Sequence, residues 1–138
     1  MVFAEYVDSG YFAVTSDARG DDILFNDFGF TMCYVEVLDG EFFELDGALA
    51  YAYEEEFCKF MLEGMYALYP ECNATFIGGI DLPVGEYKVT KNDEKRSGYW
   101  AIIDWRHDLI SNDLFEKSSY VTVEEGDLLQ LDGAHIVE

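Results

Sequence analysis

Basic side chains are scarce in this chain of 138 residues. Eight lysines and arginines stand against 29 aspartates and glutamates, which gives a net charge of −21. Contacts to phosphates require lysine and arginine, so direct binding to nucleic acid is excluded. Adhesion to an anionic membrane surface is disfavoured for the same reason. Because self-repulsion on this scale destabilises a compact chain, the acidity serves either solubility or a basic partner.

Targeting and membrane-spanning segments are also lacking. The first five residues, MVFAE, contain no basic stretch and no apolar stretch follows them, so no secretory signal is predicted. No apolar run approaches the roughly 18 residues of a membrane span. The three cysteines, an odd number without a Cys-x-x-Cys pair, are typical of reduced thiols rather than of a disulfide framework. We therefore expect a cytoplasmic protein, in the host cell if a phage encodes it.

Residues that could support catalysis or bind a metal are few and poorly spaced. His107 is expected in a charged surface turn and His135 on the final strand, so neither a Ser-His-Asp nor a Cys-His arrangement is supported. The cysteines are too far apart to form a zinc site. The acidic loop that begins at Asp17 fails the EF-hand pattern at three positions. We expect no enzymatic activity, no cofactor and no metal.

Apolar and aromatic residues, in contrast, are abundant. Half of the chain is apolar and 17% is aromatic, with 11 Phe, 10 Tyr and 2 Trp. A disordered acidic tail would lack these residues. The chain is therefore expected to fold, and its length suits one domain or two very small ones.

An internal repeat relates the two halves of the chain. Residues 9–14, SGYFAV, recur as SGYWAI at 97–102, an offset of 88. The match then resumes at an offset of 86, where LDGA at 45–48 recurs unchanged at 131–134. Glu5-Tyr6 also matches Glu86-Tyr87. Matches in one order over about 45 residues predict a duplicated unit.

Each copy has the pattern of β-strands. Val121 and Val123 alternate with polar residues, as Leu129 and Leu131 do, and period-two alternation indicates half-buried strands. Asp-Gly or Glu-Gly turns at 38–41 and 124–127 separate apolar runs and predict hairpins.

Between the copies, the apolar spacing changes to three or four residues, which predicts an amphipathic helix packed across the sheets. Acidic residues in its first turn suit the helix dipole, and Pro70 is expected to end it. The predicted apolar stripe consists of Tyr53, Phe57, Phe60, Met61, Gly64 and Leu68.

Together these patterns predict an α+β, mainly β fold, in which one connecting α-helix joins two related small antiparallel β-sandwich or barrel units. The expected boundaries are 1–52 for the first unit, 53–70 for the helix and 71–138 for the second unit. Whether the units pack as one compact domain stays open, as does the oligomeric state.

The second copy opens with GIDLPVGEYKV at 79–89 and closes with YVTVEEGDLLQL at 120–131. These stretches resemble the opening and the closing hairpin of a small β-module of Gram-positive secreted and lipid-anchored proteins, which begins G-x-D-I/L-P-x-G-E-Y-x-V. The resemblance covers about residues 75–138, with the first copy a diverged version. It implies a β-sandwich-like fold without known catalytic residues, and a fold alone does not determine function.

The acidity is shared unequally between the halves. Residues 1–78 carry 2 − 16 = −14, and residues 79–138 carry 6 − 13 = −7. An acidic face that meets a partner is therefore expected in the first copy and the helix. The candidates in the loops, the hairpin and the helix start are Asp21, Asp22, Asp27, Glu36, Asp39, Glu41, Glu44, Glu54, Glu55 and Glu56.

The first functional hypothesis is a small inhibitor that binds the basic nucleic-acid groove of a partner such as a CRISPR or restriction nuclease, with carboxylates in place of phosphates. By type, a short, acidic, aromatic-rich chain without catalytic motifs is similar to anti-CRISPR and anti-restriction inhibitors of phages and mobile elements. A compact chain of this length is roughly 37 Å across, and duplex DNA carries about 22 charges over that distance.

The alternative hypothesis is a β-sandwich binding module of the Gram-positive surface type that recognises a protein or a glycan. Its acidity would then serve solubility alone. Its contacts would come from exposed aromatic side chains, for which the candidates are Tyr11, Phe12, Tyr99 and Trp100.

Overall fold

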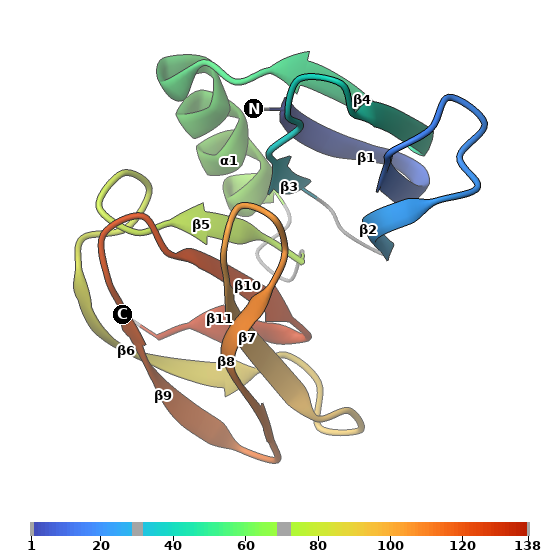
Figure 1. The fold of residues 1–138 in the computed structure, drawn as a ribbon. Coiled ribbons are helices and arrows are strands. Elements are labelled where there is room, and N and C mark those ends of the chain that lie inside the picture. The colour runs from blue at the N-terminus through green and yellow to red at the C-terminus, as the bar shows by residue number, and fades with distance from the viewer. Residues whose placement is uncertain (1, 29–31, 69–72, 138) are drawn as a thin grey trace.

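The computed structural model describes residues 2–28, 32–68 and 73–137, with side chains for 10–28, 32–64 and 73–137 (Figure 1). Within these ranges the chain is mostly β, with a single helix, as the sequence predicts. The elements are β1 (Val2–Thr15), β2 (Ile23–Phe28), β3 (Met32–Val35), β4 (Phe42–Ala52), α1 (Glu55–Leu68), β5 (Thr75–Ile77), β6 (Gly85–Lys91), β7 (Gly98–Ile103), β8 (Leu109–Phe115), β9 (Ser118–Val123), β10 (Leu128–Asp132) and β11 (Ala134–Ile136).

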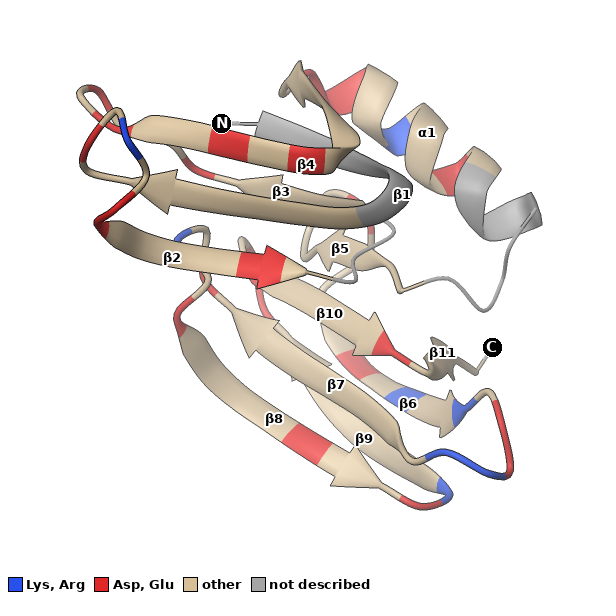
Figure 2. Cartoon of the chain, turned by 90° about the vertical axis from the view of Figure 1, so that its right-hand side faces the viewer, with Lys and Arg blue, Asp and Glu red and all other residues tan. Residues whose placement is uncertain are grey.

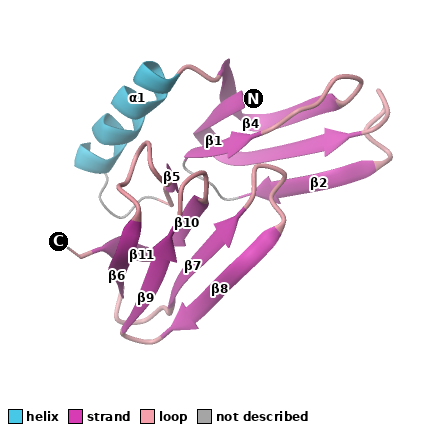
Figure 3. Ribbon diagram, turned by 60° about the vertical axis from the view of Figure 1, so that its left-hand side comes forward, coloured by secondary structure: helices cyan, strands magenta, loops and turns pink. Residues whose placement is uncertain are grey.

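The long strand β1 is the centre of the first sheet. β4 runs antiparallel along one side of β1, from the pair Val2–Ala52 to the pair Thr15–Phe42. On the other side, β3 pairs with the start of β1 and β2 pairs with its end. β4 is therefore an edge strand of this sheet, as Figure 3 shows.

The second half of the chain forms two sheets, of strand order β5-β10-β7-β8 and β11-β6-β9. The registers of the first sheet recur here with the offsets of the sequence repeat. Phe12 lies opposite Asp27 and Leu45, and Trp100 lies opposite Asp113 and Leu131. Shifts in register also fall at matching places, after Val14 in β1 and after Ile102 in β7.

The hairpin turns of the two halves have the same local geometry. Gly40 and Gly126 have φ angles of 85° and 84°, in the left-handed region that favours glycine. The Glu41 carboxylate accepts a hydrogen bond from the Leu38 amide at 2.9 Å, and the Asp127 carboxylate accepts one from the Glu124 amide at 2.9 Å.

One part of the sequence match does not agree with the strand registers. Glu5 pairs with Met32, and the residue 86 positions after Met32 is Ser118, which pairs with Thr90. Thr90, rather than Glu86, therefore occupies the position that corresponds to Glu5. The Glu-Tyr identity is only two residues long, and with a longer connection allowed in the second copy it does not fix which residues of the two strands correspond.

The predicted stripe of α1 is confirmed in part: Tyr53, Phe57 and Met61 pack against the core, but the buried face is rotated away from Phe60. Cys58 and Leu62 are buried in the main core, with Phe57 and Met61 packed beside them, whereas Phe60 is 71% exposed. The buried positions follow i, i+1, i+4, i+5, which turns Phe60 away from the sheets. Tyr53 precedes the helix, and Pro70 lies outside the described residues.

The main hydrophobic core draws on both halves of the chain. Met32 and Tyr34 of β3 pack in one cluster with α1 and with strands of the second half. A smaller cluster of Phe12, Val14, Cys33 and Val35 lies within the first sheet. Cys33 and Cys58 are buried free thiols, and burial raises the pKa of both. The described part of the chain contains no helix long and apolar enough to cross a membrane.

Candidate partner-binding surface

One end of the first sheet collects acidic loops. Because Thr15 lies opposite both Ile23 and Phe42, the loop 16–22 and the turn 38–41 emerge at the same end of the sheet. Figure 2 shows red segments in both connections and on β4 beside them. A Cβ atom on Gly20 would lie 3.1 Å from the Glu44 carboxylate, so the loop and β4 are immediate neighbours.

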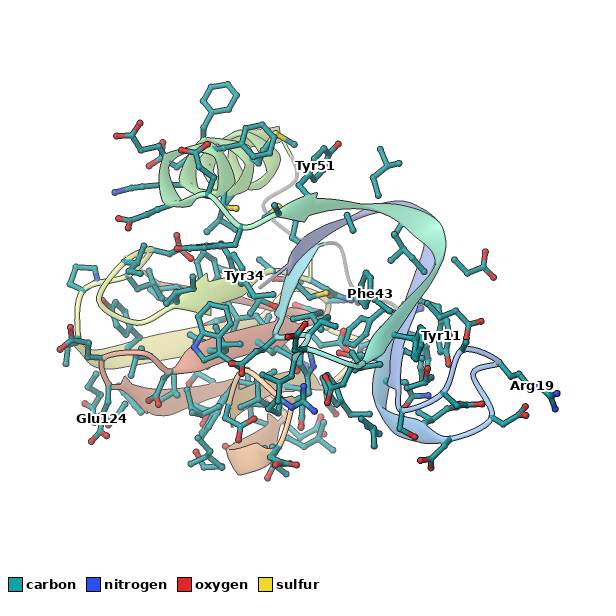
Figure 4. The ribbon with its side chains drawn as sticks, turned by 45° about the horizontal axis from the view of Figure 1, so that its top comes forward. Tyr11, Arg19, Tyr34, Phe43, Tyr51 and Glu124 are labelled. Carbon is teal, nitrogen blue, oxygen red and sulfur yellow. The ribbon has the colours of Figure 1, made fainter. Side chains whose placement is uncertain are left out.

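The loop 16–22 is held in shape by its own polar groups. Asp17 accepts hydrogen bonds from the amides of Asp22 at 2.9 Å and Asp21 at 3.3 Å. The hydrogen bond from the Asp22 amide lowers the pKa of Asp17. Asp21 and Asp22 are thereby fixed on the surface, and Arg19 points outward at the loop tip (Figure 4).

Glu41, in contrast, is already paired within the protein. Its carboxylate accepts two hydrogen bonds from Arg106, at 2.7 and 2.5 Å, and Arg106 also donates to the Glu36 carbonyl oxygen at 3.0 Å. The Arg106 guanidinium lowers the pKa of Glu41 and lies 4.7 Å from the centre of the Phe25 ring. Arg106, on the β7–β8 turn, thus ties the second half of the chain to the first hairpin.

Asp27 also has an internal role. One of its carboxylate oxygens accepts a hydrogen bond from Gln130 at 3.2 Å and lies 3.7 Å from Nδ1 of His107. The other accepts a hydrogen bond from the Phe28 amide at 2.8 Å. Asp27 therefore joins β2 to the second half of the chain and contributes less to the outer surface than its sequence context indicates.

The expectation that His107 lies on the surface is wrong. Its side chain is only 7% exposed and packs edge-on against Phe12 and face-on against Phe25, with ring centres 5.0 and 5.8 Å apart. Its Nε2 atom lies 2.8 Å from the Tyr34 carbonyl oxygen. Burial lowers the pKa of His107, although that carbonyl and Asp27 act in the opposite direction. The charged sequence of the β7–β8 turn, residues 104–108, did not indicate that its histidine would pack against the first sheet.

The ten predicted acidic residues do not form one face. Glu54 to Glu56 are exposed, but they follow the opposite end of β4, which spans up to about 33 Å at ~3.3 Å per residue. Glu36 and Glu41 are half-buried beside Arg106. Asp46, missed in the sequence, is exposed two residues beyond Glu44, a spacing that places both on one face of the strand. We define the acidic end as the exposed residues Asp21, Asp22, Asp39, Glu44 and Asp46.

Basic residues gather at the other end of the molecule. Lys95 and Arg96 lie in the β6–β7 connection. Lys91 lies beside Lys117, because the Lys91 amide donates a hydrogen bond to the Lys117 carbonyl oxygen at 3.3 Å. In Figure 2 these blue segments lie far from the acidic end. Because Asp93, Glu94 and Glu116 stand among these basic residues in the sequence, this end of the molecule is close to neutral, whereas the acidic end carries net negative charge.

A polar cavity of about 260 Å³ lies where β2 meets the second half of the chain. Nothing in the sequence pattern pointed to it, because its walls come from separate segments. Among the described residues, no group of three or more histidine, cysteine or acidic side chains could hold a metal ion. The lining residues are Asp27, Phe28, Asn73, Ala74, Thr75, Tyr99, Gln130, Leu131 and Asp132.

Two of the four aromatic residues expected on the surface are in the core. Phe12 is fully buried and Trp100 is 8% exposed. Tyr11 and Tyr99 are half-buried, and their hydroxyl groups accept hydrogen bonds from Asn26 at 3.5 Å and Asn112 at 3.2 Å. The repeated aromatic pairs alternate along their strands, so the second member of each pair faces inward.

Comparison of the chain with protein-family models, with curated proteins and with solved structures found no match.

Proposed function

We propose that this protein is an acidic, non-enzymatic inhibitor that binds the basic nucleic-acid groove of a partner, such as a CRISPR or restriction nuclease. The observation that carries the proposal is the acidic end: five exposed carboxylates on adjoining segments, with Lys91, Lys95, Arg96 and Lys117 at the far end of the molecule. An evenly solvated surface has no need of this polarity.

The acidic end is suited to replacing phosphates because its carboxylates stand on ordered supports. Hydrogen bonds to Asp17 shape the loop that carries Asp21 and Asp22. Pairing with β1 orders Glu44 and Asp46 on β4. A backbone that is ordered before binding loses less conformational entropy when its carboxylates meet lysine or arginine. Complementary charges of this kind accelerate association and weaken as salt is added.

We also propose that the chain arose as two copies of one β-unit, joined by α1. The support is the agreement between the sequence offsets and the strand registers, including the displaced pairs after Val14 and Ile102. The matching turns at Gly40 and Gly126 add to it. If so, the second copy retains the fold with less negative charge, and most of the negative charge was acquired by the first copy and the helix.

The test is capture of a CRISPR nuclease loaded with guide RNA, in low and in high salt. One variant combines Asp22→Lys with Asp39→Lys at the acidic end. The matched control combines Glu124→Lys with Glu125→Lys, which changes the net charge equally at the opposite side of the molecule (Figure 4). Glu125 is the counterpart of Asp39 at an offset of 86.

We expect the acidic-end variant to bind at least about tenfold more weakly, at roughly 0.7 kcal/mol for each lost charge pair. The control should change binding by less than about threefold. Equal losses in the two variants, or an affinity that does not depend on salt, would refute a localised electrostatic interface. A third variant that reverses Glu54 to Glu56 tests whether the helix start belongs to the same interface.

The alternative proposal, a β-sandwich module of the surface type, draws on different residues. Phe28, which is 79% exposed, lines the polar cavity together with the half-buried ring of Tyr99. Aromatic rings beside carboxylate and amide groups could recognise a glycan. Saturation-transfer NMR with cell-wall glycan fragments would favour this function if transfer were lost in a Phe28→Ala variant but kept in the acidic-end variant.

A further inference from the structure

The two halves of the chain differ at one sheet edge. In the second half, β5 pairs with the outer side of β10, opposite the side that pairs with β7. In the first half, β4 corresponds in register to β10 and pairs with β1. Among the strands that the structure describes, none pairs with the outer side of β4 (Figure 3). Within residues 2–28, 32–68 and 73–137, the edge that β5 covers in one half is therefore open in the other.

The geometry of β5 shows which backbone groups this edge presents. The Leu131 amide donates a hydrogen bond to the Ala74 carbonyl oxygen at 3.0 Å, and the Gly78 amide donates one to the Asp127 carbonyl oxygen at 2.8 Å. Backbone groups that face the same neighbour alternate along an antiparallel strand, so Leu129 also faces β5. At an offset of 86, the residues that correspond to Asp127, Leu129 and Leu131 are Glu41, Phe43 and Leu45. These peptide groups of the first half point away from β1.

The side chains along this edge select what can pair with it. Phe43 and Leu45 pack inward with the small core cluster, whereas Glu44 and Asp46 are exposed. A second copy of this chain, added antiparallel about Glu44, would set Glu44 against Glu44 and bring together two molecules of charge −21. Like charges directly opposite each other destabilise strand pairs. A segment with basic residues at these positions meets opposite charges instead.

We propose that the outer edge of β4 from Phe42 to Asp46, here called the β4 edge, binds an extended basic segment of the partner protein as an added antiparallel strand. This inference rests on the proposed function, since it assumes that the acidic end meets a basic protein. Main-chain hydrogen bonds between the two strands provide affinity, and the side chains that lie opposite Glu44 and Asp46 provide specificity. An apolar residue opposite Phe43 continues the inner face, as Phe76 does opposite Leu129 in the second half.

The protein itself provides the template for a probe peptide. Residues 73–78, NATFIG, include β5, and Thr75 of this strand lies opposite Gln130, which corresponds to Glu44 at an offset of 86. Asn73 lies two residues before Thr75, at the position that corresponds to a partner of Asp46. Changing Asn73→Lys and Thr75→Lys in a synthetic, end-capped peptide gives the sequence Lys-Ala-Lys-Phe-Ile-Gly. In the template register its two lysines lie opposite Asp46 and Glu44.

The experiment titrates this peptide into the ¹⁵N-labelled full chain and follows amide shifts and amide hydrogen exchange. We expect shifts concentrated at residues 41–46. When free peptide is ten times its Kd, exchange of the Phe43 and Leu45 amides should slow about tenfold, because only the free fraction exchanges. In a Glu44→Gln, Asp46→Asn variant the affinity should fall about fivefold, as two exposed cross-strand charge pairs are lost.

Two N-methylated peptides test the strand geometry without altering the protein. Methylation of the phenylalanine amide blocks a donor that faces β4 and should abolish the shifts. Methylation of the second lysine amide, which faces away, should leave them. The proposal is overturned if millimolar peptide causes no shifts at 41–46, if both methylated peptides bind equally, or if shifts fall on β10 through exchange with β5. If the chain dimerises in the absence of a partner and a Glu44→Lys variant does not, the β4 edge binds a second copy of the chain. This result would also overturn the proposal.

Failure of the docking mode is distinguishable from failure of the proposed function. If nuclease capture depends on the acidic end but the peptide does not bind, the inhibitor function stands and strand addition fails. If the peptide binds but no nucleic-acid-binding protein is captured, the β4 edge stands as a binding site for basic segments, whereas the inhibitor proposal and its nuclease partner fail.

Discussion

The buried position of Phe12 leads to a quantitative prediction for the variant Phe12→Ala. Phe12 is fully buried, with its ring centre 5.9 Å from Phe43 and 5.0 Å from His107. It therefore contacts both the first sheet and a turn of the second half. If the side chain instead served as an exposed binding residue, its removal would cost the folded state little.

The magnitude follows from the area and the cavity. A phenylalanine buries about 150–250 Å², which at ~25 cal/mol per Å² corresponds to roughly 4–6 kcal/mol, part of which alanine retains. The cavity left among Phe25, Phe43 and His107 adds to the loss. Measured Phe→Ala changes in cores lie at about 3–5 kcal/mol. A domain of ordinary stability has only about 5–15 kcal/mol, so the variant should lose a large share of its free energy of unfolding.

The assay is urea unfolding followed by tryptophan fluorescence and far-UV circular dichroism. For an m-value of about 2 kcal/mol per M, the transition midpoint should fall by roughly 1.5–2.5 M urea, with both signals moving together. Phe28→Ala is the matched control, because this side chain is 79% exposed and its loss should cost less than about 0.5 kcal/mol. A cost below about 1 kcal/mol for Phe12→Ala would refute the packing described here.

Two further predictions concern a buried histidine and a pair of glycines. Burial depresses the pKa of His107 in the folded protein below its ordinary value of about 6.5. Near and below pH 6.5 the unfolded chain therefore binds more protons than the folded protein does. The stability that neutral His107 contributes to the folded protein is lost as the pH falls through and below 6.5. His107→Asn tolerates the φ of 60° and removes this titration, so the stability gap between wild type and variant should narrow from pH 7.5 to pH 5. A constant gap in urea unfolding would contradict this. Gly40→Ala and Gly126→Ala should each cost about 1–2 kcal/mol and agree within ~0.5 kcal/mol, since both have open space but left-handed backbone. Clearly unequal costs would show that the turns are not equivalent.

The sequence predicted the β-rich fold well because its signals are local. Alternating apolar residues placed β9 and β10, and glycine-containing turns marked the hairpins at Gly40 and Gly126. The pairing registers of β1 and β7 agree with the offsets of 88 and 86, although the sequence analysis did not predict which strands would pair. Register depends on the hydrophobic pattern and on turn geometry, and both are similar in the two halves.

The errors came from features that depend on tertiary packing. The helical stripe is broad enough that a small rotation of α1 decides between burying Phe60 and burying Cys58. His107 enters the core because the β7–β8 turn docks on the first sheet, which no local pattern encodes. In the same way, Arg106 removes Glu41 from the set of free carboxylates. The acidic composition was plain from the sequence, but which acids share a surface depended on these long-range contacts.

The acidic end and the open β4 edge have a common physical explanation. An unpaired strand edge exposes amide and carbonyl groups that invite pairing with any extended chain, and proteins restrict this pairing with charge. Glu44 and Asp46 supply that charge here, and they repel a second copy of the same protein. The same two carboxylates leave the edge open to a segment that brings lysine or arginine. Edge carboxylates that only protect the protein from self-association would be present under either function, so binding of a basic segment to the β4 edge is the observation that separates the two.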